Sequence, residues 1–297
     1  MLAATAMAAA VVAMAPVSAR AETRVVEEKE SQYNHIFIYK RDQYVSLIFG
    51  HNRRLYTESL ANTKDPLELP VEYTRYMTVA MAYAPAARRL LEIGLGGGTT
   101  VSYLNRTYPA LKIDAVELDP VVATFARKYF YLKENANLKV IVRDGRVFLV
   151  RSQDTYDVIM IDAYRGPFVP FHLLTREFYQ LVKKRLAKGG VVAQNIEPST
   201  MLYEAAVATI AAEFDNVEIY PASGNFVLIA YNGPRRTDED LRAVAGQIDA
   251  EYKPRYPLSK IVTERRKPAK TDGQKLTDDF APVQMLKSIE RHNKKRP

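Results

Sequence analysis

Cysteine and tryptophan are absent from this chain of 297 residues, and histidine occurs only four times. Without thiols the chain has no disulfide framework, no thiolate-bound zinc or iron–sulfur site and no cysteine nucleophile. The four histidines are scattered without metal-ligand spacing, so we expect no metal site. The sequence also lacks a Gly-x-Ser-x-Gly motif, which argues against the nucleophile elbow of a hydrolase.

A strong charge imbalance is also lacking. Lysine and arginine number 42 against 34 aspartates and glutamates, which gives a formal net charge of +8. This excess is compatible with nucleic acid or an anionic surface but selects neither. The basic clusters at residues 265–267 and 294–296 lack interleaved aromatic side chains, which is typical of a solvated tail. We therefore expect no specific nucleic-acid partner.

The first 21 residues differ in composition from the rest of the chain. Residues 2–17 carry no charge, and Ala19-Arg20-Ala21 has the form of a signal-peptidase cleavage site. The apolar run is short for a membrane span, so we expect a cleaved signal peptide over residues 1–21 and an exported, periplasmic chain without a transmembrane domain. A basic n-region is missing. A mis-assigned start codon, or a cytoplasmic protein with an alanine-rich leader, is therefore the alternative.

Residues 22–70 predict a small β domain with its linkers. A charged linker at 22–30 precedes alternating apolar residues at 35–39 and 44–49, and a third short run follows at 55–57. This period of two indicates an antiparallel β meander. Residues 71–83 then carry apolar side chains at helical spacing, which predicts one helix with a buried face.

The segment from residue 71 to about residue 250 alternates between strand and helix patterns. We expect strands at 88–93, 112–117, 138–142, 156–161 and 191–196, helices at 99–108, 120–132, 173–186 and 204–214, and a closing β pair at 217–220 and 226–231. This order predicts a Rossmann-like, doubly wound, mostly parallel sheet whose ligand binds at the carboxyl ends of the strands. Residues 251–297 are expected to form a basic C-terminal extension.

A glycine loop and one acid point to a nucleoside. Gly94, Gly96 and Gly98 follow the first strand of this sheet and open a helix, so the backbone can turn tightly and approach a ligand closely. The spacing is one residue tighter than the dinucleotide fingerprint, so a pyrophosphate is not the obvious ligand. Glu117 ends the next strand, where a carboxylate can accept both hydroxyls of a ribose.

Two further acids stand at strand ends. Asp144-Gly145 follows the third strand and is placed to bind an adenine amino group, and Asp162-Ala163-Tyr164 follows the fourth strand at the mouth of the cleft. Taken alone, each aspartate is better explained as a helix cap or an ordinary strand-end residue. Together with Glu117 and the glycine loop they mark four successive strand ends, which favours a binding site.

These segments resemble the spermidine synthase (polyamine aminopropyltransferase) family. The similarity lies at residues 94–98, 116–120, 143–145, 156–162 and 174–179, with entry and exit segments at 31–36 and 276–283. The resemblance implies the fold of class I S-adenosylmethionine-dependent transferases. It also implies transfer of an aminopropyl group from decarboxylated S-adenosylmethionine to a diamine, with release of methylthioadenosine.

The resemblance implies a role for each matching residue. Asp162 would be the catalytic base, Glu117 the ribose ligand and Asp144 the adenine ligand, while Tyr73 and Tyr164 would lie on the side of the amine substrate. The other positions assigned to the donor are Asn34, Gly94, Gly96, Gly98 and Gly145. A homodimer is left open.

Two departures from the family keep alternatives open. The family usually has an aspartate where this chain has Gly97, and a second one where it has Arg165. The glycine favours a methyltransferase that uses S-adenosylmethionine itself, because methionine's carboxylate would be repelled by an acid there. The leader favours a third hypothesis, a non-catalytic exported protein that binds a nucleoside or polyamine.

Overall fold

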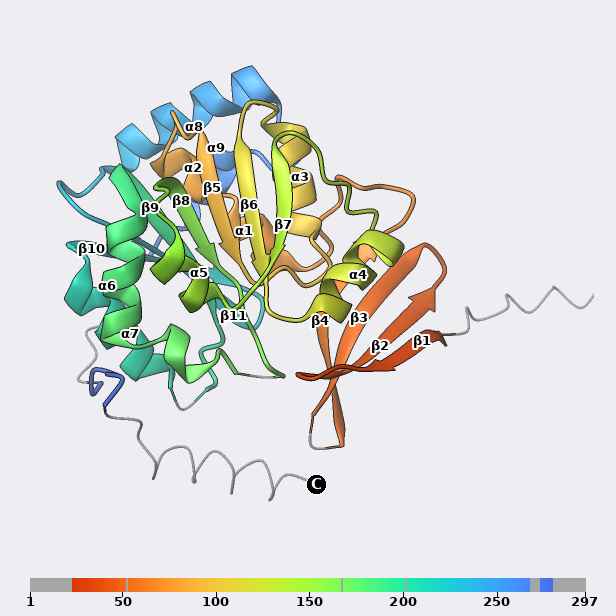
Figure 1. Cartoon of the computed structure of the whole chain (residues 1–297). Helices are drawn as coiled ribbons and strands as arrows, with labels where there is room; N and C mark the ends of the chain where they lie inside the picture. Colours follow the sequence, from red (N-terminus) through yellow and green to blue (C-terminus); the bar gives the residue numbers. More distant parts are fainter. Residues whose placement is uncertain (1–22, 52, 167, 201, 268–272, 280–297) are drawn as a thin grey trace, which may run out of the picture.

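The N-terminal part of the chain forms a small antiparallel sheet. The computed structural model describes residues 23–51, 53–166, 168–200, 202–267 and 273–279. The sheet contains, in spatial order, β1 (Arg24–Glu30), β2 (His35–Arg41), β3 (Tyr44–His51) and β4 (Arg54–Asn62) (Figure 1). Its strands alternate buried and partly exposed residues, so one face is apolar. That apolar face packs against the rest of the molecule.

The larger sheet of the described residues has seven strands. From edge to edge they are β10 (Asn216–Ala222), β11 (Asn225–Tyr231), β9 (Leu186–Ile196), β8 (Tyr156–Ile161), β5 (Arg89–Ile93), β6 (Lys112–Glu117) and β7 (Leu138–Val142). The last five strands are parallel to one another, and β11 pairs in antiparallel fashion with β9 on one side and β10 on the other. The predicted doubly wound sheet and its closing β pair are confirmed. The strand order reverses between β5 and β8, which is where such sheets bind ligands.

Helices cover both faces of this sheet. One face carries α1 (Glu72–Met77), α2 (Ala80–Tyr83), α3 (Thr99–Thr107), α8 (Asp238–Tyr252) and α9 (Leu258–Ile261), and the other carries α5 (Gly145–Arg151), α6 (Arg176–Arg185) and α7 (Tyr203–Glu213) (Figure 1). Alternate strand residues divide accordingly, since Leu90 packs into the first core and Leu91 into the second. The described residues also contain two short 3₁₀ helices, Phe171–Leu173 and Val262–Glu264.

Helix α4 (Pro120–Tyr129) joins the small sheet to the large one. Ala123 and Ala126 face the core of the large sheet, while Val122 and Phe125 pack against the apolar face of β2 and β3. Asp119 begins the helix by accepting a hydrogen bond from the backbone N–H of Val121 at 2.9 Å. The small sheet is therefore held over the carboxyl ends of the parallel strands.

The segment expected to be a charged linker at residues 22–30 is a strand for most of its length. Strand β1 pairs with β2 along the edge of the small sheet, and nearly all its side chains are exposed. An edge strand with two polar faces lacks the apolar alternation that reveals a strand in sequence, and its charges protect the free edge. The linker prediction was wrong for this reason.

Several other boundaries differ from those expected. The single helix predicted at residues 71–83 is two short helices, α1 and α2, separated at Thr78 and Val79. Strand β9 begins at Leu186, five residues before the strand expected at 191–196. Helix α5 was not predicted, because its seven residues are too few to show a clear period.

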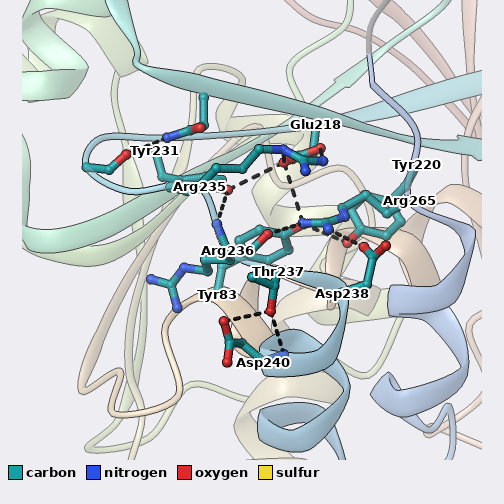
Figure 2. Close-up of polar contacts among 12 residues, drawn as sticks. Tyr83, Glu218, Tyr220, Tyr231, Arg235, Arg236, Thr237, Asp238, Asp240 and Arg265 are labelled. Carbon is teal, nitrogen blue, oxygen red and sulfur yellow. Dashed lines mark hydrogen bonds and ion pairs between the residues drawn. The ribbon is translucent and has the colours of Figure 1, made fainter.

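The region expected as a solvated C-terminal extension contributes to the fold where it is described. Leu258 is fully buried in α9. Further along, the Arg265 side chain is only 3% exposed and lies beside the buried carboxylate of Glu218 on β10, with 3.5 Å between Nη1 and Oε1. Arg235 binds the same carboxylate at 3.0 Å, and Asp238 pairs with Arg265 from the start of α8 (Figure 2). This network ties the segment after α9 to the sheet, contrary to the expectation of a solvated tail at residues 265–267.

The predicted signal peptide at residues 1–21 and the last residues of the exit segment, 280–283, lie outside the described residues. Within the described part of the chain, no helix combines the length and the apolar character needed to cross a lipid bilayer.

Candidate active site

A cavity of about 400 Å³ lies at the carboxyl ends of β5, β6 and β8. Strand β4, helix α1 and the segment before β2 supply its other walls. The residues predicted from the sequence that line it are Asn34, Tyr73, Gly94, Gly96, Glu117, Asp144, Gly145, Asp162 and Tyr164. The structure thus brings together side chains that are up to 130 positions apart in the chain, as expected for strand ends that meet at one edge of a sheet.

The glycine loop has no room for side chains at Gly94 and Gly96, its two glycines that line the cavity. Gly94 has a φ of 93°, and a Cβ there would lie 2.3 Å from the carbonyl oxygen of Asp162. Gly96 has a φ of 51°, and a Cβ there would lie 2.5 Å from Oγ of Ser59 on β4. Positive φ and close approach together require glycine. The loop is held by β4, because the Gly97 N–H donates to Ser59 Oγ at 2.8 Å.

Gly98, which was predicted to bind the donor, lies outside the cavity lining. It is the N-cap of α3 with a φ of 70°. A Cβ at this position would lie 3.1 Å from Cδ1 of Leu132 and 3.2 Å from Cδ1 of Leu95. Its part in the site is conformational. Gly97 faces away as well, since a Cβ at this position would lie 2.4 Å from Cδ1 of Phe130.

Glu117 is fixed by two backbone hydrogen bonds at the end of β6. One carboxylate oxygen accepts from the N–H of Leu95 at 2.9 Å and the other from the N–H of Asp119 at 2.9 Å. Burial raises the pKa of this carboxyl, and the backbone donors oppose the rise. The side chain is thereby set in one orientation in the cavity wall, with further lone pairs free to accept ligand hydroxyls.

Asp162 directly follows β8, and its carboxylate is held from two sides. Asn195 Nδ2 donates to its Oδ1 at 2.9 Å, and the side chain of Tyr73 hydrogen-bonds to the same carboxylate. Asn225 Nδ2 in turn donates to Asn195 Oδ1 at 3.0 Å, which fixes the orientation of that amide. Burial raises the pKa of Asp162 to about 6, against the lowering effect of these hydrogen bonds. A carboxyl with this pKa is ionised at neutral pH and can still take up a proton.

Asp144 is a helix cap that also faces the cavity. Its Oδ1 accepts from the N–H of Val147 at 2.8 Å at the start of α5, and its Oδ2 lies 3.1 Å from Nε2 of His172. The hydrogen bond to His172 lowers the pKa of Asp144. The cap was one of the two interpretations open from sequence. Neighbouring Gly145 is required by packing, because a Cβ there would lie 2.3 Å from Cγ2 of Ile93.

Asn34 connects the small sheet to the site. Its Nδ2 donates to Oδ2 of Asp119 at 3.2 Å, and Ser31 Oγ donates to the same oxygen. Asp119 is buried and also caps α4, so three elements meet at one carboxylate. Asn34 and Asp119 therefore lie next to each other in the cavity wall.

Glu58 is a cavity residue that the sequence did not reveal. It lies on β4, and its carboxylate oxygen Oε1 is buried without a hydrogen-bond partner. Burial and the nearby charges of Asp162 and Glu117 raise its pKa to about 8. Asn195 was missed as well, although a polar pair, Gln194-Asn195, at the end of an otherwise apolar strand was a usable signal.

Acids outnumber bases in the cavity wall. The carboxylate residues that line it are Glu58, Glu117, Asp119, Asp144 and Asp162, and Arg165 is the one arginine or lysine among the described lining residues. Arg165 is exposed at the outer end, next to Tyr164, whose pKa is raised by burial. A wall rich in buried carboxyl groups favours a cationic ligand, because Coulomb attraction strengthens where water is excluded. The glycine loop and Glu117 suit a nucleoside, and Asp162 suits proton transfer.

Comparisons with known proteins agree with this chemistry. Residues 72–226 match a family model described as the spermine/spermidine synthase domain. A polyamine aminopropyltransferase from Vibrio vulnificus is 30% identical over 281 residues, which cover 90% of this chain and 92% of that protein. A second relative, the probable polyamine aminopropyl transferase of Bifidobacterium longum, is 30% identical over 285 residues, which cover 89% of this chain and 63% of that protein.

Solved structures show the same fold. Spermidine synthase from Thermotoga maritima superposes with a TM-score of 0.67 at 21% identity, covering 82% of this chain and 85% of that one. At these identities the likeness concerns the fold alone. It is the class I methyltransferase-like α/β fold with a small antiparallel sheet at the N-terminus.

Proposed function

The chain belongs to the spermine/spermidine synthase family, and from this premise we propose that it transfers an aminopropyl group from decarboxylated S-adenosylmethionine to an amine. The observation that carries the proposal is the placement of Asp162. Its carboxylate lines a cavity rich in acids, is oriented by Asn195 and Tyr73, and has a pKa raised to about 6. Such a group can bind an amine and accept its proton at neutral pH.

The donor fits the wall formed by β5 and β6. Gly94 and Gly96 leave their backbone open to the cavity, and Glu117 presents a fixed carboxylate to the ribose hydroxyls. Asp144 and Gly145 lie at the next strand end and are assigned to the adenine. The donor's sulfonium is cationic, so the surplus of carboxylates stabilises it by Coulomb attraction.

The transfer balances without any further reactant. The amine nitrogen forms a bond to the aminopropyl carbon as the carbon–sulfur bond breaks, and the electron pair of that bond goes to sulfur. Sulfur leaves as the neutral thioether of methylthioadenosine. The amine arrives protonated and must lose a proton to have a lone pair, and Asp162 accepts that proton. Tyr73 and Asn195 keep the carboxylate pointed at the acceptor.

The direct test is release of methylthioadenosine. Purified protein is incubated with decarboxylated S-adenosylmethionine and putrescine or another diamine, and the products are measured by mass spectrometry. We expect methylthioadenosine and the aminopropylated amine in equal amounts. Absence of both products with every diamine tried would overturn the proposal.

Donor binding has its own test. Methylthioadenosine at about 100 times its Kd should stabilise the native chain by about 2.7 kcal/mol, because a ligand that binds only the folded state shifts the unfolding equilibrium. Glu117→Ala should abolish this gain, whereas Glu239→Ala on the exposed side of α8 should keep it. An unchanged melting temperature of the wild type at millimolar ligand would refute the nucleoside assignment.

A methyltransferase reaction is the second candidate, because the residues of the glycine loop that line the cavity, Gly94, Leu95 and Gly96, include no acid. The loop has no acid that would repel the carboxylate of S-adenosylmethionine. The ionised carboxylates among the described residues of the cavity wall act against that donor for the same reason. Binding of the two donors, with and without the carboxylate, therefore separates the two reactions.

A further inference from the structure

Glu58 occupies a break in the pairing of the small sheet. Strand β4 pairs with β3 through Ser59 and Leu47 on one side of the break, and through Thr57 and Ile48 on the other. Glu58 between them has no partner, so the strand bulges at this residue. Bulges re-aim side chains and recur beside active sites. Here the bulge faces the cavity, and the Glu58 side chain forms part of its wall.

The bulge is anchored to the glycine loop. Ser59, the next residue, accepts a hydrogen bond from the Gly97 N–H at 2.8 Å. The position of Glu58 relative to the donor wall is therefore set by a direct contact between β4 and the turn after β5. A backbone held in this way keeps its position when a ligand binds, which lowers the ordering cost of binding.

Glu58 differs from every other acid in the cavity wall in what its oxygens contact. Glu117 has a backbone donor on each oxygen, Asp144 has a backbone donor and His172, and Asp162 has Asn195 and Tyr73. Asp119 accepts from Ser31, Asn34 and the backbone of Val121.

By contrast, Oε1 of Glu58 is buried with no partner. A buried carboxylate oxygen without a donor is costly, and a ligand cation would remove the cost.

The surroundings of Glu58 favour a cation over a neutral donor. Asp162 and Glu117 are close enough to act on it electrostatically, and together with burial they raise its pKa to about 8. Near neutral pH the empty cavity thus keeps Glu58 largely protonated, and a bound cation would restore the charged form. The donor in the proposed function brings such a cation, the ammonium at the end of its aminopropyl arm.

We propose that Glu58 binds the ammonium group of the aminopropyl arm and thereby selects decarboxylated S-adenosylmethionine over S-adenosylmethionine. The inference rests on the proposed function and names the residue that gives it donor specificity. S-adenosylmethionine carries a carboxylate beside its ammonium, and that carboxylate meets the acidic wall formed by Glu58, Asp162 and Glu117.

The test compares two ligands that differ in the aminopropyl arm. Glu58→Gln keeps the shape of the side chain and removes its charge, and calorimetry measures the Kd of decarboxylated S-adenosylmethionine and of methylthioadenosine, which lacks the ammonium. We expect the first Kd to rise about tenfold or more, as for loss of a charge-assisted hydrogen bond, and the second to stay within about twofold. Preference for the decarboxylated donor over S-adenosylmethionine should fall by a similar factor.

The matched control is Glu239→Gln, which removes one negative charge from an exposed position on α8 and should change neither Kd. Methylthioadenosine binding also reports that Glu58→Gln has folded. Equal weakening of both ligands, or no weakening of either, would overturn the role of Glu58 while wild-type turnover still supports the proposed function. Failure of the wild type to bind either ligand would overturn both.

Discussion

The side-chain amide of Asn195 donates a 2.9 Å hydrogen bond to Asp162, joining the ends of the neighbouring strands β9 and β8. The amide cannot rotate freely, because its oxygen accepts from Asn225 on β11 at 3.0 Å. A row of three polar side chains across three adjacent strands therefore sets the position and the proton affinity of the proposed base. Asn195 is a positioning residue in this row.

The first prediction concerns the pH dependence of turnover. Asp162 must be ionised to accept a proton, so kcat/KM should rise with pH through an apparent pKa of about 6. The Asn195 hydrogen bond stabilises the ionised form, and Asn195→Ala should therefore move this limb to higher pH. Asn225→Ala should give a smaller shift in the same direction. A pH–rate profile measures both, and an unmoved limb in Asn195→Ala would contradict the positioning role.

The second prediction concerns Asp162→Asn. Turnover should fall by about 10² to 10⁴, the usual effect of losing a general base, while the Kd of methylthioadenosine stays nearly unchanged. The free energy of unfolding, in contrast, should be higher in the variant than in wild type above about pH 6. The folded-state pKa of Asp162 is raised, so its ionisation costs stability as pH rises from about 4 to about 6, and that cost persists at higher pH.

Asparagine cannot ionise, so the variant should gain about 1–3 kcal/mol relative to wild type at pH 8 and little at pH 4. Chemical denaturation at the two pH values checks this difference. A variant that turns over normally would rule out Asp162 as the base, whatever its stability.

The third prediction concerns the acceptor. Arg165 lines the outer end of the cavity, where its positive charge opposes a diamine. Arg165→Asp replaces repulsion by attraction, and we expect the KM for putrescine to fall roughly tenfold with the donor KM unchanged. Arg165→Gln removes the positive charge without adding a negative one, so the logarithm of the KM for putrescine should fall by about half as much. If both variants use putrescine no better than wild type, the arginine does not face the acceptor.

The fourth prediction concerns the ion-pair network of β10 (Figure 2). Arg265→Ala leaves the buried carboxylate of Glu218 with Arg235 as its remaining arginine partner, and should destabilise the fold by about 3 kcal/mol. The matched control is Arg127→Ala, whose partner Glu134 is partly exposed, and it should cost about 1 kcal/mol or less. Urea denaturation compares the two. Equal losses would show that the Arg265 contact behaves as a surface pair.

The fifth prediction concerns the start of the chain. We propose that residues 1–21 are removed on export, because an uncharged apolar run precedes Ala19-Arg20-Ala21. Mass spectrometry of the protein from the envelope fraction of its native host should then find Glu22 at the N-terminus. Intact leader on protein recovered from cytosol would exclude export.

The strand ends could be predicted from sequence, and the cavity follows from them. Glu117 and Asp162 each end an apolar run, and parallel strands bring such positions to one edge whatever the details of packing. Asn195 lies near the end of β9 and follows the same rule, although its side chain is an amide and not an acid. Gly98 shows the converse, because the loop spacing alone does not say which glycine faces the ligand.

Glu58 could not be found in this way. Its position depends on a bulge created by the register between β3 and β4, and register is decided by packing across the whole sheet. Strand β1 could not be predicted for a related reason, because it forms by pairing with β2 and its own sequence lacks a strand pattern. The C-terminal contact of Arg265 likewise depends on Glu218, a residue 47 positions away.

The ring of Phe130 affects which substitutions the glycine loop can accept. A Cβ on residue 97 would lie 2.4 Å from Cδ1 of that ring, so an acid at this position of the glycine loop requires the ring to move or to be replaced. Removing the ring first would open a hole in the core between α4 and the small sheet, at a typical cost of about 3–5 kcal/mol. We expect each change alone to destabilise the fold, and a smaller residue at position 130 to relieve the clash made by a side chain at position 97. Mutagenesis that aims to place an acid at position 97 is therefore best designed with positions 97 and 130 changed together.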